Sequence, residues 1–212
     1  MENKGKDRMK DLRDRARNFF EDVDPSHDWH HVRRVEKMAL RLAEMKDADK
    51  KVVRAGALLH DIGRGKEDRG EIDEHASWGA ERSRDILGDL GFRQGVIDSV
   101  SHVIEAHRYS KKPEPETLEA RVLSDADNLD ALGAVGIARG FAYSGEHGRV
   151  MFSDSGDVET ARDHFRSKIL SLDERMFTEP ARKIADERKK YVEEFLDRVE
   201  SEMRAEDQAD AS

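Results

Sequence analysis

The sequence predicts an all-α protein, and three observations support this fold class. The four prolines lie at positions 25, 113, 115 and 180, so long stretches of the chain carry no helix-breaking residue. In these stretches apolar residues recur every three or four positions, the spacing of a helix with one buried face. Hydrophobic residues make up 36% of the 212 residues and charged residues 40%, so a core forms only if the apolar side chains share such faces.

The first part of the chain predicts three helices. The first covers about residues 6–20. The segment Asp24-Pro25-Ser26 then provides a stop and an N-cap for a long helix that runs to about Met45. A third helix over residues 49–60 is strongly apolar, and we expect it to be buried. Gly63 and Gly65 are expected to end it in a charged loop.

Further helices are expected over residues 74–87, 94–107, 118–132, 158–172 and 179–203. Glycines or a Lys/Pro/Glu loop at 110–116 separate the first three of these helices. The glycine-rich segment 140–156 predicts a surface loop over a pocket, and residues 204–212 predict a frayed acidic tail. Because no repeat or long linker interrupts the pattern, we expect a single domain.

Composition excludes several classes of function. The chain has 47 acidic and 38 basic residues, a formal net charge of −9, which argues against a surface that coats nucleic acid. It contains no cysteine, so disulfides, thiolate metal sites and a cysteine nucleophile are excluded. Any metal must therefore be held by the nine histidines and by carboxylates.

The start of the chain, residues 1–8, is charged throughout and lacks the apolar core of a signal peptide. No apolar run approaches the roughly 20 residues that span a bilayer. We therefore expect a cytoplasmic protein without a membrane partner.

The most informative polar pair is His60-Asp61, which follows the apolar run 55–59. Both side chains can reach one ion where the helix ends, and Gly63 indicates such an end. A histidine beside a capping aspartate is the alternative reading of this pair alone.

A second histidine group, His27, His30 and His31, opens the long helix. His27 and His31 are four residues apart and could form a two-histidine metal site on one face. We prefer the alternative in which His31 alone faces inward, because it begins the apolar stripe continued by Val35 and Leu42. His30 is then expected to face solvent, and His27 to be a structural neighbour.

Three aspartates interrupt a stretch that is otherwise spaced like a buried helix. Asp125 and Asp130 could be solvated or act as caps, whereas Asp127 lies between Ala126 and Leu129. A buried carboxylate is costly without a partner. Asp127 is therefore the best candidate to face a cation.

A histidine, a later His-Asp doublet and a distant aspartate, in this order, resemble the pattern of the HD-domain superfamily of metal-dependent phosphohydrolases. The matching residues are His31, the doublet His60-Asp61, and Asp127. The segments 26–31, 104–110, 129–139 and 181–188 are similar to a small single-domain bacterial and archaeal subgroup. The resemblance covers about residues 19–202 and implies a helical HD domain over residues 1–204, with residues 205–212 as a disordered tail.

The resemblance implies that His31, His60, Asp61 and Asp127 ligate a divalent metal ion. Imidazole and carboxylate ligands suit Mn²⁺, our first expectation, and Fe²⁺, Co²⁺, Ni²⁺ or Zn²⁺ better than Mg²⁺, which remains an alternative. Such an ion activates water for attack on phosphorus. Asp61 is then also expected to orient or deprotonate the water.

Substrate phosphate needs positive partners, and Arg64, Lys66 and Arg108 follow the two histidine segments. A solvated charged loop is the alternative for these residues. We expect His75 to act in catalysis and His107, rather than His102, to point toward the site and contact substrate. In some HD proteins extra histidines bind a second metal, but one metal is our preferred reading.

The sequence thus predicts a phosphohydrolase acting on a small phosphorylated compound, with a nucleotide as the first class and release of pyrophosphate from a triphosphate as the preferred reaction. A dinuclear phosphodiesterase and a non-catalytic nucleotide- or metal-binding regulator are the alternatives. A homo-oligomer is compatible with the sequence. Trp29 and Trp78 are expected to serve in the core or in a helix staple rather than to stack on a base.

Overall fold

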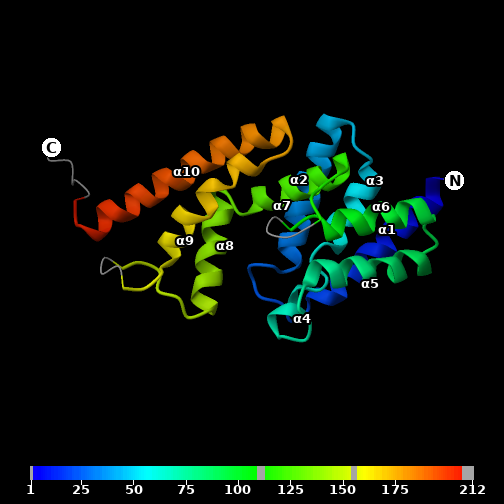
Figure 1. The fold of residues 1–212 in the computed structure, drawn as a ribbon, viewed down its shortest axis with the longest axis horizontal. Coiled ribbons are helices and arrows are strands. Elements are labelled where there is room, and N and C mark those ends of the chain that lie inside the picture. Colours follow the sequence, from blue (N-terminus) through cyan, green and yellow to red (C-terminus); the bar gives the residue numbers. More distant parts are fainter. Residues whose placement is uncertain (1, 109–112, 154–156, 207–212) are drawn as a thin grey trace. The chain divides into compact units, whose positions relative to one another are not determined.

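The computed structural model describes residues 2–108, 113–153 and 157–206, and the regular elements in these ranges are all helical (Figure 1). The chain forms two compact units, residues 1–128 and 129–212. None of the helices in the described ranges combines the length and the apolar composition that a bilayer crossing requires.

The described residues of the first unit form seven α-helices and a short 3-10 turn, with the last helix continuing two residues beyond the unit. They are α1 (Glu2–Arg17), the 3-10 turn η1 (Asn18–Phe20), α2 (Trp29–Lys46), α3 (Lys50–Leu59), α4 (Arg64–Asp68), α5 (His75–Asp89), α6 (Gln94–Glu105) and α7 (Leu118–Asp130). Helix α3 packs against α1, α2 and α6, and α5 lies along α6 (Figure 1). The apolar run of α3 is buried as expected.

In the part of the second unit that the structure describes, the elements are α8 (Gly133–Glu146), α9 (Ala161–Ser167), two 3-10 turns and the long α10 (Glu179–Met203). Helix α10 packs along α8, and α9 packs on α8 as well. The bounds of α10 match the expected helix over residues 179–203, because Thr178 caps it and Pro180 occupies its first turn. Of the tail expected at 204–212, residues 207–212 lie outside the described residues.

Three local expectations were wrong. The cap of α2 is Asp28 instead of Ser26, since the carboxylate of Asp28 accepts a hydrogen bond from the backbone N–H of His31. The charged loop after Gly63 contains a short helix, α4, and Gly65 lies inside it. Helix α8 continues through Gly140 to Glu146, so the expected loop at 140–156 begins later; residues 154–156 lie outside the described ranges.

Candidate metal centre

Helix α2 places His31 in the interior, as the apolar stripe predicted. Its side chain is fully buried, and the neighbouring His30 is exposed. The ring of His27 lies 5.7 Å from that of His31, while its Nδ1 is 2.7 Å from Ser26 Oγ. His27 is therefore a neighbour of His31, as expected.

The end of α3 supplies His60 and Asp61. His60 Nδ1 donates to the carbonyl of Ala57 at 2.8 Å, so its proton is on Nδ1 and Nε2 is left as a free electron-pair donor. That Nε2 lies 3.3 Å from His31 Nε2. The turn after Asp61 packs tightly: a Cβ at Gly63 would lie 2.8 Å from the backbone oxygen of His75. Because residue 63 is glycine, the start of α5 can pack against the His60-Asp61 doublet.

The carboxylate of Asp61 lies between two pairs of histidines. Its Oδ2 is 3.6 Å from Nε2 of both His31 and His60. Its Oδ1 is 3.3 Å from His75 Nε2 and 3.6 Å from His107 Nε2. One buried carboxylate therefore faces ring nitrogens on both sides.

Asp127, on α7, completes the set expected from the sequence. Its Oδ1 is 3.4 Å from His31 Nε2 and 3.9 Å from His60 Nε2, and its side chain is 28% exposed. The other two aspartates differ from the expectation that they are solvated or act as caps. Asp125 is fully buried, and Asp130 is buried and paired with Arg139 at 3.0 Å.

His75 and His107 belong to the same cluster, whereas His102 does not point to it. His107 Nδ1 donates to the carbonyl of Ile104 at 2.5 Å, which leaves Nε2 toward Asp61. The His75 and His107 rings are 5.4 Å apart. His102 Nε2 instead accepts a hydrogen bond from the backbone N–H of Glu116. Of the two histidines considered in α6 and just after it, His107 is the one brought to the site.

Burial and mutual charge set the protonation of these groups. Burial lowers the pKa of His60 to about 4, against the opposing pull of Asp61 and Asp127. Burial alone would raise the pKa of Asp61, but His60 and the other three histidines hold it well below its usual range. Burial also acts to lower the pKa of His107, but Asp61 raises it above its ordinary value. The inner cluster thus contains a neutral His60 and an ionised Asp61 near neutral pH.

The donor set fits a divalent metal ion. His31, His60 and Asp61 offer ligand atoms within 4.8 Å of one another, and so do Asp61, His75 and His107. Neutral imidazole and carboxylate are the ligands that Mn²⁺, Fe²⁺, Ni²⁺ and Zn²⁺ accept in proteins. The buried cluster can therefore hold a divalent metal.

Carboxylates surround the arginines that were expected to meet substrate phosphate. Arg108 Nη1 donates to Glu67 Oε1 at 2.9 Å and to Glu74 Oε1 at 3.3 Å. Arg64 pairs with Glu67 at 3.7 Å and with Asp68 at 3.2 Å. The sequence reasoning missed Glu67 and Glu74, because no spacing distinguishes them within a charged loop.

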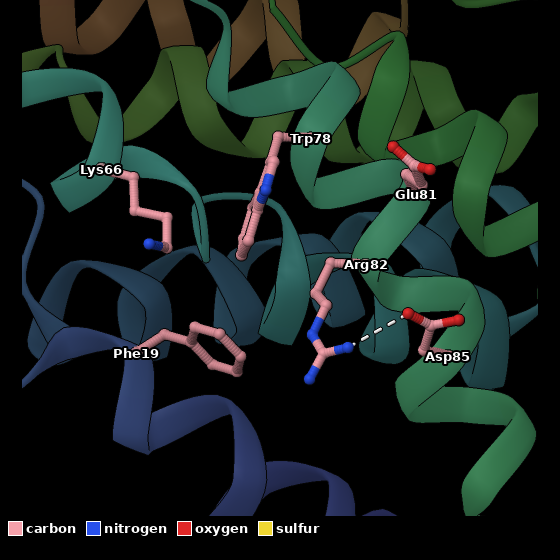
Figure 2. Close-up of a pocket in the computed structure, with 6 residues that line it drawn as sticks. All are labelled: Phe19, Lys66, Trp78, Glu81, Arg82 and Asp85. Atoms are coloured by element: carbon pink, nitrogen blue, oxygen red, sulfur yellow. Dashed lines mark hydrogen bonds and ion pairs between the residues drawn. The ribbon is translucent and has the colours of Figure 1, made fainter. Parts of the chain in front are cut away.

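Lys66 faces a separate hollow of about 530 Å³ (Figure 2). Its Nζ pairs with Glu71 at 2.7 Å and lies 5.7 Å from the centre of the Trp78 ring. The lining of this hollow is Phe19, Lys66, Trp78, Glu81, Arg82 and Asp85, and Arg82 pairs with Asp85. Trp78 also packs edge-on against Phe19, and Trp29 packs against Phe20, which agrees with packing roles for both tryptophans.

The helical unit and its histidine and aspartate cluster define the class of protein. The model of the HD domain family matches residues 28–132. The chain belongs to the HD-domain superfamily, as the order of its histidines and aspartates indicated.

Similar proteins extend this result over most of the chain. The uncharacterized protein YpgQ of Bacillus subtilis is 32% identical over 91% of this chain and 92% of its own. A crystal structure of YpgQ in complex with ADP has a TM-score of 0.76 at 30% identity, covering 92% of this chain and 97% of that one. A structure described as an HD-superfamily hydrolase from Bacillus thuringiensis has a TM-score of 0.77 at 32% identity, covering 95% of this chain and 99% of that one.

Proposed function

We propose that this protein is a metal-dependent phosphohydrolase that acts on a nucleotide. The observation that carries the proposal is the position of Asp61, a buried carboxylate whose two oxygens face ring nitrogens of four histidines. Burying an ionised carboxylate is energetically costly unless nearby groups compensate its charge. A bound cation and an anionic substrate account for the whole arrangement.

His31, His60, Asp61 and Asp127 would hold the metal, with Mn²⁺ as the first expectation. When bound, the ion supplies a Lewis acid for a phosphoryl oxygen and lowers the pKa of water. Asp61 orients the attacking water and accepts its proton at a carboxylate oxygen. Asp127 is the most exposed of the four, so it lies where water and substrate reach the cluster.

The reaction is hydrolysis of a phosphoanhydride or phosphoester bond. The oxygen of water bonds to phosphorus, the bridging P–O bond breaks, and the departing group takes up a proton, for which His75 is the proposed donor. The complex of the related YpgQ with ADP supports a nucleotide as the substrate class. Arg64 and Arg108 are the proposed phosphate partners, and they would exchange a carboxylate contact for a phosphate contact. His107 is the proposed further contact to substrate, and Lys66 remains a proposed contact from the neighbouring hollow.

A panel assay tests this function. Nucleoside mono-, di- and triphosphates and simple phosphomonoesters are incubated with Mn²⁺, Mg²⁺, Co²⁺ or Ni²⁺, and the products are separated to distinguish pyrophosphate from phosphate. We expect Mn²⁺-dependent hydrolysis of a triphosphate to a monophosphate and pyrophosphate. His60→Ala should abolish it, whereas His30→Ala, a change at an exposed histidine of the same region, should not. Binding of nucleotides without hydrolysis of any would favour a regulator instead.

One observation favours a second candidate, a dinuclear phosphodiesterase. Asp61 turns one oxygen to His31 and His60 and the other to His75 and His107, so His31, His60 and Asp61 would hold one ion, and Asp61, His75 and His107 would hold a second. Two-metal sites stabilise both the attacking and the leaving oxygen. Two Mn²⁺ per chain together with faster hydrolysis of a phosphodiester than of nucleoside triphosphates would support this candidate, while one Mn²⁺ per chain would contradict it.

A further inference from the structure

Three arginines from three helices surround the buried carboxylate of Glu36. Arg13 of α1 donates through Nη2 to Glu36 Oε1 at 2.6 Å. Arg33 of α2 and Arg54 of α3 face the carboxylate through Nε, at 3.3 Å from Oε2 and 3.5 Å from Oε1 respectively. This arginine cluster (Arg13, Arg33, Arg54 and Glu36) therefore combines three positive charges with one negative charge.

Glu36 does not satisfy the donors that surround it. Three guanidiniums carry more N–H groups than the two oxygens of one carboxylate can accept. Within the described residues, the buried Nε atoms of all three arginines lack a hydrogen-bond partner. The side chains of Arg13, Arg33 and Arg54 are 36%, 40% and 42% exposed. The guanidiniums that Glu36 holds together are therefore also within reach of a solute.

The sequence around the arginine cluster adds like charge instead of balancing it. Side chains four residues apart lie on the same face of a helix. The charged residues at this spacing are all basic, namely Arg17 beside Arg13, Lys37 beside Arg33, and Lys50 beside Arg54. Like charges at this spacing destabilise a helix. In a chain with a net charge of −9, this local excess of cations is unfavourable by itself, and a bound anion would offset it.

We infer that the arginine cluster is a binding site for a single phosphate group, either inorganic phosphate or the phosphate of a small molecule. The planar donors of a guanidinium pair with two phosphate oxygens at once. One carboxylate lies within 3.5 Å of all three guanidiniums, so the cluster has the size of one phosphate group rather than of a long polyanion.

The arginine cluster is distinct from the metal centre. In the described part of the chain, none of its members forms a hydrogen bond or an ion pair with His31, His60, Asp61 or Asp127. The inference therefore does not rest on the proposed function, and it can be tested without metal.

Calorimetric titration of the full chain with inorganic phosphate tests the inference, with a chelator present and the sodium chloride concentration held constant. The chelator prevents a metal ion from recruiting phosphate to the metal centre, and constant salt keeps the screening of charges equal. We expect a saturable phosphate site. Arg33→Gln and Arg54→Gln should each weaken binding by about 10–100-fold, the range that corresponds to one hydrogen bond to a charged group.

Three further variants locate the bound phosphate, and circular dichroism verifies that each is folded. Arg33→Lys keeps the positive charge but not the planar fork, so it should recover part of the loss seen in Arg33→Gln. Arg82→Gln changes an exposed arginine of α5 that pairs with Asp85, and it should bind phosphate as the wild type does. Arg108→Gln removes a proposed phosphate partner beside the metal centre and should leave the site at the arginine cluster intact.

The results that overturn this inference differ from those that overturn the proposed function. A wild type without saturable phosphate binding overturns the inference, as do Arg33→Gln and Arg54→Gln variants that bind as tightly as the wild type. Loss of all binding in Arg108→Gln also overturns it, because the phosphate would then lie beside the metal centre. So does a chain that binds an RNA oligonucleotide through these arginines but not inorganic phosphate. Metal-dependent hydrolysis is tested separately by the nucleotide panel.

Discussion

Glu36 on α2 is a buried carboxylate that joins the helices carrying His31 and His60. It is only 3% exposed and accepts a hydrogen bond from Arg13 of α1 at 2.6 Å. Arg33 of α2 lies 3.3 Å from it, and Arg54 of α3 lies 3.5 Å from it. Replacing Glu36 by Gln removes the charge but little volume, so the variant isolates the electrostatic contribution.

The size of the effect follows from these contacts. A hydrogen bond to a charged, buried group contributes about 1.5–3 kcal/mol. The two longer pairs involve arginines that are 40% and 42% exposed, so each contributes about 0.2–1 kcal/mol. Because Gln keeps one neutral acceptor for Arg13, only part of that bond is lost, and we expect Glu36→Gln to lower the free energy of unfolding by about 1.5–3.5 kcal/mol.

Urea unfolding followed by far-ultraviolet circular dichroism measures this difference at pH 7 and 25 °C. The matched control is Glu44→Gln, an exposed residue of the same helix that pairs with Lys50; its effect should stay below about 1 kcal/mol. A loss for Glu36→Gln no larger than that of the control would refute the argument, since Glu36 would then contribute no more than a surface ion pair.

Three other predictions concern packing, pH and the metal. A Cβ at Gly136 would lie 2.1 Å from the backbone oxygen of Ala131, so Gly136→Ala should lower the unfolding free energy by at least about 2 kcal/mol. Gly145→Ala, in the same helix, where a Cβ would meet only the end of the Met151 side chain at 4.0 Å, should raise it by up to about 1 kcal/mol; equal effects on urea unfolding would contradict this reasoning. Burial and nearby positive charges lower the pKa of His164 below 6.5. The stability that depends on neutral His164 is therefore fully present above that pH and is lost as the pH falls through the lowered pKa. His164→Gln should accordingly lose less stability than the wild type between about pH 7.5 and about pH 5, and parallel pH profiles would disprove it. Asp127→Asn should weaken Mn²⁺ binding in calorimetric titration without changing the circular dichroism spectrum, and unchanged affinity would exclude Asp127 as a ligand.

The sequence predicted the elements that local rules determine. Apolar spacing located α3 and α10 closely, and the structure adds that Asp49 and Thr178 cap them. The inward direction of His31 followed from the stripe that it begins. The order of His31, His60-Asp61 and Asp127 indicated the family, which the comparisons confirm.

Tertiary packing explains what the sequence did not predict. Gly140 was expected in a loop, but the ring of Phe165 packs so closely that a Cβ there would lie 2.4 Å from it. The glycine is therefore needed within a helix, against the usual preference. Glu67 and Arg108 are 41 residues apart, and a single sequence does not show contacts between side chains at such separations.

The most direct test of the central claim is nucleotide hydrolysis by the metal-stripped protein, before and after Mn²⁺ is restored, in the wild type and in Asp61→Asn. The buried cluster predicts no turnover after stripping, recovery with Mn²⁺ in the wild type, and neither Mn²⁺ binding at the cluster nor turnover in Asp61→Asn. Turnover that persists in the stripped wild type, or in Asp61→Asn, would contradict the proposal that this cluster is a metal-dependent active site.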